Sequence, residues 1–254
     1  MNKILQSIKR KIKKTPLAGI IHVIIANAKS QGIYLTYLAN LYGSDKGTVH
    51  REKHNYTRHY HRYFDVLRHR PIRFLEIGLC RGLFENWAQD DVPSIRMWLK
   101  YFPQAVIYGY DISDFSFFCH DRFRFFQGDQ GSREDLIRFA KTLDGPLDII
   151  LEDGSHASHH QQISLGVLFP YLKPGGVYII EDLHWQPPEI EKSNASKTID
   201  ILKKVLSKEK FYSEYLTPEE NDYLNSNIDQ VDYFSGQRNR NYLLGYVAII
   251  TKKA

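Results

Sequence analysis

The chain of 254 residues is 43% hydrophobic, so it can bury one sizeable core as a single domain, with or without a small appendage. Its formal net charge is +5, and every charged residue before Asp45 is basic. A basic arm on a near-neutral body differs from a nucleic-acid-binding domain, in which basic residues line a folded face. We therefore expect no nucleic-acid partner.

The two cysteines, Cys80 and Cys119, form no C-x-x-C pair, which argues against a disulfide scaffold and a zinc finger and suits a reducing cytosol. The basic start, the apolar run 17–25 and the small residues after it resemble a signal peptide. The run is too short to span a bilayer, however, and Gly19 and His22 interrupt it. We expect a cytoplasmic protein.

An N-terminal unit, residues 1–30, is expected to hold a basic amphipathic helix over 2–28. Ile4, Leu5 and Ile8 recur there at helical spacing, with lysines on the opposite face. Such a helix can lie on an anionic membrane surface, here the inner face of the membrane, or it can pack on the core or on a partner subunit of a homo-oligomer. The sequence leaves both destinations and the oligomeric state open.

Residues 31–70 are expected to form a helical segment that caps a ligand pocket. The loop Ser44-Asp-Lys-Gly47 is followed by a predicted helix over 56–68, with Tyr60, Phe64 and Leu67 on one side. The histidines at 50, 54, 59 and 61 have spacings that match no familiar zinc pattern. We interpret them as a solvated or aromatic-packed face.

Residues 71–254 alternate between strand and helix patterns, as a doubly wound α/β sheet requires. The polar segment 217–241 exceeds the usual loop length, so we expect a functional lid or a mobile segment there. The expected strands are 73–77, 105–110, 122–127, 147–151, 177–180, 211–216 and 242–251, and the expected helices include 83–102, 132–143 and 158–172.

The segment Phe74-Leu-Glu-Ile-Gly-Leu-Cys-Arg-Gly82 indicates a cofactor-binding turn. A strand ends near Glu76, and the chain turns through Gly78 and Gly82, at the place where an open parallel sheet binds cofactors. The spacing is not the G-x-G-x-x-G of dinucleotide sites, and Glu76 would repel a phosphate. A carboxylate here suits a cofactor with a positive amino group and no phosphates, which describes S-adenosylmethionine.

Acidic residues recur at the expected strand ends, which all open on one crevice. Asp111 is placed to accept hydrogen bonds from ribose hydroxyls and Asp129 from an adenine amino group, although either alone fits a turn. Asp153 and the pair Glu181-Asp182 come from neighbouring strand ends. Carboxylates can converge in this way around a cation, and oxygen ligands select a hard ion, Mg²⁺ first and Mn²⁺ or Ca²⁺ next.

His156 follows Asp153 on the turn into the next helix, where it can act as a general base toward a hydroxyl beside the metal. A sugar hydroxyl is barely acidic, so a metal that stabilises the alkoxide and a base that takes the proton are both useful. His159 and His160 fall inside the helix, and we interpret them as surface or acceptor-side residues.

The turn is followed in order by Ile107-Tyr-Gly-Tyr-Asp111, Gly128-Asp-Gln-Gly131, Asp153-Gly-Ser-His156 and Leu172-Lys-Pro-Gly-Gly-Val-Tyr-Ile-Ile-Glu-Asp182. This series resembles the class I S-adenosylmethionine-dependent methyltransferases. Within them it is similar to the metal-dependent sugar O-methyltransferases of the mycinamicin kind, which act on macrolide deoxysugars. The cephalosporin hydroxylase-like group is similar in the same segments. The resemblance extends over about residues 40–185 and includes the loop 44–47.

The resemblance implies a Rossmann-like sheet of seven strands whose last strand is antiparallel, with S-adenosylmethionine and Mg²⁺ or Mn²⁺ as cofactors. Where the macrolide enzymes have a larger N-terminal region this chain has a basic arm, so we expect the acceptor to be a sugar of a glycan, a glycolipid or a glycosylated natural product. We assign cofactor contacts to Glu76, Gly78, Gly82, Asp111, Asp129, Asp45 and Lys46, the metal site to Asp153, Glu181 and Asp182, and the base to His156.

Three alternative functions remain. A non-catalytic scaffold that binds S-adenosylmethionine would not need a complete set of Asp153, His156 and the pair Glu181-Asp182. A nicotinamide-dependent oxidoreductase would need the third glycine and would be opposed by Glu76. A methyltransferase for a small molecule other than a sugar is the third alternative.

Overall fold

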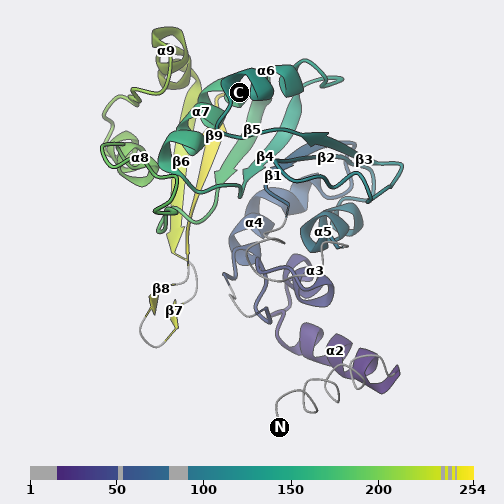
Figure 1. Ribbon diagram of the computed structural model, residues 1–254. Helices are drawn as coiled ribbons and strands as arrows, with labels where there is room; N and C mark the ends of the chain where they lie inside the picture. Colours follow the sequence, from purple (N-terminus) through teal and green to yellow (C-terminus); the bar gives the residue numbers. More distant parts are fainter. Residues whose placement is uncertain (1–15, 51–53, 80–90, 236–237, 240–241, 244) are drawn as a thin grey trace.

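The centre of the molecule is a sheet of seven strands in the order β3-β2-β1-β4-β5-β9-β6 (Figure 1). The computed structural model describes residues 16–254 apart from 51–53, 80–90, 236–237, 240–241 and 244. Strand β9 runs antiparallel to both β5 and β6, so the expected sheet with an antiparallel last strand is confirmed. The strands are β1 Arg73–Ile77, β2 Val106–Asp111, β3 Phe123–Gln127, β4 Leu147–Glu152, β5 Leu172–Ile180, β6 Ile228–Ser235 and β9 Tyr246–Lys252, with a separate pair of β7 Arg238–Asn239 and β8 Tyr242–Leu243.

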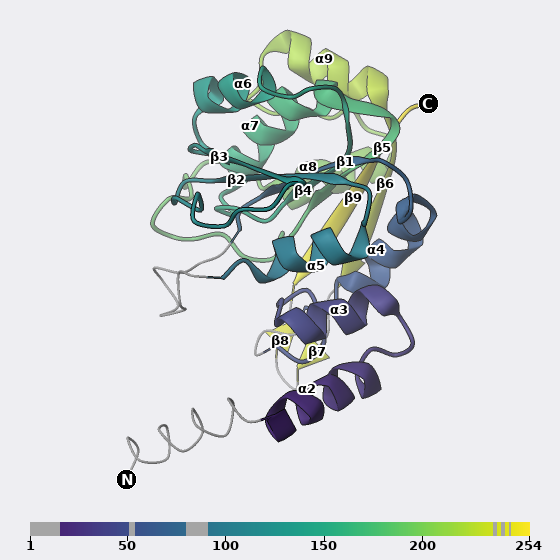
Figure 2. The same ribbon diagram turned by 90° about the vertical axis from the view of Figure 1, so that its right-hand side faces the viewer.

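Helices cover both faces of the sheet, as Figure 2 shows. One face carries α3 Tyr34–Tyr42, α4 Thr57–Phe64 and α5 Pro93–Tyr101, and α2 Pro16–Ala28 lies beyond α3. The other face carries α6 Arg133–Ala140, α7 Ser158–Leu168, α8 Thr198–Leu206 and α9 Pro218–Asn227. The expected continuous helix 83–102 is wrong at Asp91 and Val92, which are not helical, and α5 begins at Pro93, where the proline occupies the first helical position. Residues 83–90 of that expected helix lie outside the described part.

Two apolar cores result from the alternation of side chains along the strands. On β1, Phe74 joins the core beneath α4 and α5, while its neighbour Leu75 joins the core beneath α6 and α7. The first core is rich in rings: Phe64 of α4 packs edge-on against Phe74 and Trp98, with centroids 6.0 and 5.8 Å apart. Residues 31–70 are therefore fixed to the sheet by buried aromatic contacts.

Helix α2 projects from the body and contacts α3 (Figures 1 and 2). His22 bonds the carbonyl of Leu41 at 3.0 Å, and the amide of Asn40 donates to the carbonyl of Ala26 at 3.3 Å. The apolar side chains on its outer face are in solvent; Ile20 and Ile24 are 58% and 60% exposed. Of the expected N-terminal helix, residues 2–15 lie outside the described part. Within that part, no helix has the length and apolarity needed to cross a membrane.

The C-terminal third differs from the expectation. The segment 211–216 is not a strand, because asparagines of α9 bond its backbone instead of a neighbouring strand. Asn225 accepts from the amide of Phe211 and donates to its carbonyl, both at 2.8 Å, and Asn221 does the same for Ser213 at 2.9 and 3.0 Å. The stretch 217–241, expected to be a lid or a mobile segment, contains α9 and the edge strand β6.

Candidate active site

Buried carboxylates gather where three neighbouring strands end. Glu76 lies in β1, Asp153 follows β4, and Glu181 and Asp182 follow β5. The register aligns these ends, since Ile77 pairs with Glu152 and Glu152 pairs with Ile180. Glu76, Glu181 and Asp182 are at most 4% exposed. The structure thus brings the three predicted metal ligands and one predicted cofactor carboxylate to a single edge of the sheet.

Lys46 reaches into the centre of this group from the loop after α3. Its ammonium Nζ bonds Oδ2 of Asp153 and lies 3.1 Å from Oε2 of Glu181, 3.7 Å from Oε1 of Glu76 and 3.9 Å from Oδ1 of Asp45. The side chain is only 2% exposed. Of the two residues of this loop that were predicted to contact a cofactor, Asp45 is part-exposed, whereas Lys46 contacts carboxylates from both predicted sites.

Two tyrosines of the same N-terminal segment donate hydrogen bonds to the acidic pair after β5. The phenol of Tyr56 donates to Oδ1 of Asp182, and that of Tyr60 to Oε1 of Glu181, each at 2.6 Å. The segment 31–70 therefore contributes side chains to the site itself, in addition to the covering role that the sequence predicted. Sequence reasoning missed the roles of both tyrosines, although two tyrosines four positions apart lie on one face of a helix, facing the crevice they were expected to cap.

Two of the four histidines at 50, 54, 59 and 61, His54 and His59, pack against aromatic rings, as one of the two interpretations expected. His59 stacks on Phe234 with ring centroids 4.3 Å apart. His54 stacks on Tyr56 at 5.1 Å, and its Nδ1 lies 3.6 Å from Oδ1 of Asp182. His54 is therefore close enough to influence the charge of the acidic group.

The buried acids of this group outnumber the cations beside them, and the pKa values of most of these acids are raised. Burial raises the pKa of Glu76 to about 8, although Lys46 opposes that shift. Burial, with Asp153 as the nearest acid, raises the pKa of Glu181 well above its usual value. Burial also raises the pKa of Asp153 against the effect of Lys46. For Asp182 the effect of burial is outweighed by His54, His156 and the hydrogen bond from Tyr56, so its pKa is lowered.

A divalent cation fits this arrangement. Asp153, His156 and Asp182 each offer one ligand atom, and these atoms lie within 4.8 Å of one another. The carboxylate oxygens of Asp153 and Asp182 suit a hard cation such as Mg²⁺ or Mn²⁺. His156 and Asp182 both have positive backbone φ angles, 60° and 52°, which non-glycine residues adopt uncommonly and which recur at functional sites. Both oxygens of Glu181, in contrast, already face protein donors, Tyr60 and Lys46.

The predicted cofactor turn has a clear backbone geometry up to Leu79. Gly78 has a φ of 82°, and a Cβ there would collide with the carbonyl of Asp153, so the turns after β1 and β4 touch only because this residue is glycine. Asp111 holds the turn from the next strand: its Oδ2 accepts from the amide of Leu79 at 2.7 Å. Gly82, another predicted contact, lies outside the described residues.

One of the two carboxylate oxygens of Glu76, which lies in β1 just before this turn, accepts no hydrogen bond from the described residues. Its Oε2 accepts from the hydroxyl of Ser94 at 2.8 Å and from the indole of Trp98 at 3.1 Å. Its Oε1 is buried and accepts no hydrogen bond from the described residues. An unbonded carboxylate oxygen in this place fits a ligand with a positive amino group. Asp129, predicted to meet adenine, lies at the end of β3 and accepts from the amide of Gly131 at 2.8 Å.

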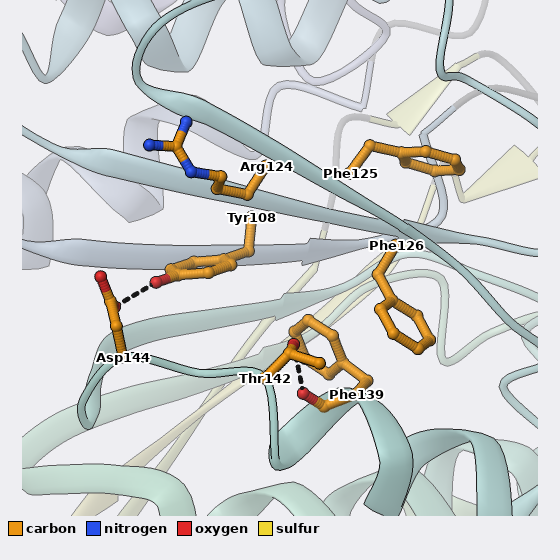
Figure 3. Close-up of a pocket in the computed structure, with 7 residues that line it drawn as sticks. All are labelled: Tyr108, Arg124, Phe125, Phe126, Phe139, Thr142 and Asp144. Atoms are coloured by element: carbon orange, nitrogen blue, oxygen red, sulfur yellow. Dashed lines mark hydrogen bonds between the residues drawn. The ribbon is translucent and has the colours of Figure 1, made fainter.

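A hollow of about 360 Å³ lies elsewhere, between β2, β3 and α6 (Figure 3). Its rim includes Tyr108, whose hydroxyl bonds Asp144 just before β4 begins. One side of the hollow therefore lies next to the loop before β4, at the amino end of that strand, whereas the carboxylates lie at the carboxyl ends. His159, expected at the surface or on the acceptor side, is 6% exposed and packs on Tyr215 with ring centroids 5.6 Å apart.

The strand order with one antiparallel strand next to the edge is that of the class I S-adenosylmethionine-dependent methyltransferases, so the chain has their Rossmann-like fold. The chain matches no family model. It is related to sugar O-methyltransferases of the mycinamicin type, as three comparisons demonstrate.

Mycinamicin VI 2''-O-methyltransferase of Micromonospora griseorubida is 43% identical over 130 residues, which cover 51% of this chain and 32% of that protein. An 8-demethyl-8-(2-methoxy-alpha-L-rhamnosyl)-tetracenomycin-C 3'-O-methyltransferase of Streptomyces olivaceus is 34% identical over 78% of this chain and 50% of its own length. The chain thus spans at most half of these relatives. The MycE methyltransferase in complex with Mg, SAH and mycinamycin VI superposes with a TM-score of 0.66 and 30% identity, covering 98% of this chain and 63% of MycE.

Proposed function

We propose that the protein transfers a methyl group from S-adenosylmethionine to a hydroxyl of a sugar, with Mg²⁺ or Mn²⁺ bound at the acidic group. The observation that supports this most strongly is the convergence of Asp153, His156 and Asp182 beside Glu76. The relatives named above, which act on sugars of macrolides and tetracenomycins, support the same reaction class and the choice of a glycosylated acceptor.

The residues divide between two ligands. Glu76, Gly78, Asp111 and Asp129 lie at the ends of β1, β2 and β3 and would hold S-adenosylmethionine, with Oε1 of Glu76 accepting from its amino group. Asp153, Glu181 and Asp182 would hold the cation, and His156, whose ring nitrogen lies within 4.8 Å of carboxylate oxygens of Asp153 and Asp182, would act as the base and not as a ligand. When bound, S-adenosylmethionine supplies the methyl group, and the cation supplies positive charge that stabilises the developing charge on the acceptor oxygen.

His156 would take the proton of the acceptor hydroxyl. Its Nε2 lies 4.0 Å from Oδ2 of Asp182, so the carboxylate would stabilise the imidazolium that forms. The ring also meets the indole of Trp185 at a centroid distance of 5.9 Å, which fixes one side of the base. Trp185 is 43% exposed and would offer an apolar surface on the acceptor side.

The N-terminal arm suggests where the acceptor lies. The described helix α2 carries no charged residue, exposes Ile20, Ile21 and Ile24, and follows a run of basic residues in the sequence. Exposed apolar and basic residues on one arm complement the acyl chains and the head groups of an anionic membrane surface. We therefore propose a cytoplasmic enzyme that contacts the inner face of the membrane and methylates a glycan or glycolipid sugar.

The reaction is tested by incubating the full chain with methyl-labelled S-adenosylmethionine and a glycan and glycolipid extract, with Mg²⁺ and again with a chelator. Label that enters a carbohydrate only with metal is the expected result, and Asp153→Asn should give none while still binding the cofactor. Transfer that persists under chelation would contradict the metal's role. Cofactor binding without transfer to any sugar or small molecule would favour a scaffold.

A further inference from the structure

Among the described residues, Lys46 is the cation nearest to two acids of the proposed metal site, Asp153 and Glu181. Within the part of the chain that the structure describes, the side chain of Asp153 has no other hydrogen-bond partner, and Glu181 has only Tyr60 besides. The ammonium is buried with them, and together these groups carry more acids than bases. Lys46 therefore occupies the oxygens that a divalent cation would need.

We propose that Lys46 is a built-in counter-ion of the acidic group: it holds Asp153 and Glu181 together when no metal is bound, and it must leave Asp153 when a divalent cation binds. This rests on the proposed metal site. An ammonium and a divalent cation repel each other strongly at the separation that shared carboxylate oxygens impose. The two cations therefore compete for Asp153.

Hydrogen bonds hold the backbone of the loop around Lys46. Gly43 ends α3 in the left-handed conformation, with a φ of 80°. The carbonyl of Lys46 accepts from the amide of Thr57 at 3.2 Å, and that of Gly47 from Asn55 at 3.0 Å. On the preceding side of the lysine, the carbonyl of Asp45 accepts from the amide of His54 at 3.0 Å. These bonds hold the loop backbone, so a shift of the ammonium would come from rotation within its four-carbon stem.

Glu76 offers the displaced ammonium a second position. Its Oε1 lies 3.7 Å from Nζ, beyond hydrogen-bond distance, and accepts no other hydrogen bond from the described residues. When no S-adenosylmethionine is bound, whose amino group would otherwise take this oxygen, a shift of the ammonium toward Glu76 would release Oδ2 of Asp153 and keep the buried charge paired. Lys46 is thus a positioning residue that weakens metal binding in exchange for a stable metal-free site.

The test is the substitution Lys46→Met in the full chain, with Mn²⁺ and Mg²⁺ affinity measured by calorimetry and the unfolding temperature measured with and without metal. We expect the metal-free variant to unfold at a lower temperature than the wild type. We expect its metal affinity to rise by about tenfold, and added metal to raise its unfolding temperature more than that of the wild type. Lys173→Met is the matched control, since it removes a lysine bonded to Asp148 at 2.8 Å, away from the carboxylate group.

A metal affinity that is unchanged or weaker in Lys46→Met would overturn the competition. If that variant does not fold, Lys46→Met combined with Asp153→Asn should fold, because the surplus acid is removed with the lysine; failure of the pair would also overturn it. A wild-type chain that binds neither ion would remove the metal site and this inference together. If the wild-type chain binds the metal and Lys46→Met binds it no more tightly, the proposed reaction stands and only the proposed role of Lys46 is removed.

Discussion

Tyr56 donates a hydrogen bond of 2.6 Å to Asp182, 126 positions further along the chain. The bond uses Oδ1, so Oδ2 is left on the side of His156. Groups that orient a metal ligand typically change metal affinity 10- to 100-fold when they are removed. We expect Tyr56→Phe to weaken Mn²⁺ binding by about tenfold and to slow methyl transfer, as measured by calorimetry and by label incorporation.

The control for that experiment is Tyr63→Phe, in helix α4, which Tyr56 directly precedes; the phenol of Tyr63 bonds Asp232 instead of a site residue. It should leave Mn²⁺ affinity within the error of the wild type. Equal losses in both variants would mean that the effect comes from α4 as a whole and not from the orientation of Asp182.

The substitution Glu76→Gln tests the proposed binding of S-adenosylmethionine separately from that of the cation. The amide keeps an oxygen for Ser94 and Trp98 but cannot become negatively charged, as Glu76 would when the positive amino group of the cofactor binds beside it and lowers its pKa from about 8. We expect the affinity for S-adenosylmethionine to fall by about tenfold or more, because a hydrogen bond to a charged partner contributes about 1.5–3 kcal/mol. Titration calorimetry with the cofactor alone measures this. Cofactor affinity equal to that of the wild type would place the amino group elsewhere.

The outer face of α2 predicts binding to anionic vesicles. The full chain should sediment with vesicles that contain phosphatidylglycerol and less with neutral ones, and high salt should weaken the binding. The pair Ile20→Ser and Ile24→Ser, on side chains 58% and 60% exposed, should reduce it without loss of stability. Vesicle binding that this pair leaves unchanged would contradict the proposal, and a change of oligomeric state instead would assign the face to a second copy of the chain.

His59 predicts a loss of stability in acid. Its pKa is lowered to about 4, first by burial and then by Arg58 and Arg62, whereas an unfolded histidine titrates near 6.5. The unfolded state therefore binds more protons below pH 6.5, and stability should fall as the pH drops from there toward 4. His59→Phe should remove on the order of 2 kcal/mol of this loss. Denaturant unfolding at pH 7 and pH 4.5 measures it, with His61→Gln on the same helix as control.

The central sheet and the acids at its edge could be predicted from sequence because both follow from local patterns. The apolar runs of β1 and β4 fix which strands are buried, and parallel strands bring the residues after their ends together. Asp153 and the pair Glu181-Asp182 meet for that reason alone. The sequence does not say which of their oxygens bond protein donors, as both oxygens of Glu181 do.

The features that the sequence did not predict depend on contacts between distant segments of the chain. The pattern of 211–216 favours a strand, but Asn221 and Asn225 supply the hydrogen bonds that a neighbouring strand would have supplied. Lys46 could be assigned to the site by resemblance, yet nothing in its neighbours indicates which carboxylates it contacts. From the sequence, Tyr60 is predicted only to lie on the apolar side of a helix, and Tyr56 only to begin that helix.

Folding must join remote parts of the chain before the site exists. Lys46 and Tyr60 meet Glu181 across 135 and 121 positions, and Lys46 meets Asp153 across 107. Contacts that close such long loops are entropically costly and form late. A fragment that starts at residue 71 would still hold all the strands, but its acids would lack their lysine and both phenols. The N-terminal segment thus supplies donors of the site that the sheet alone does not contain.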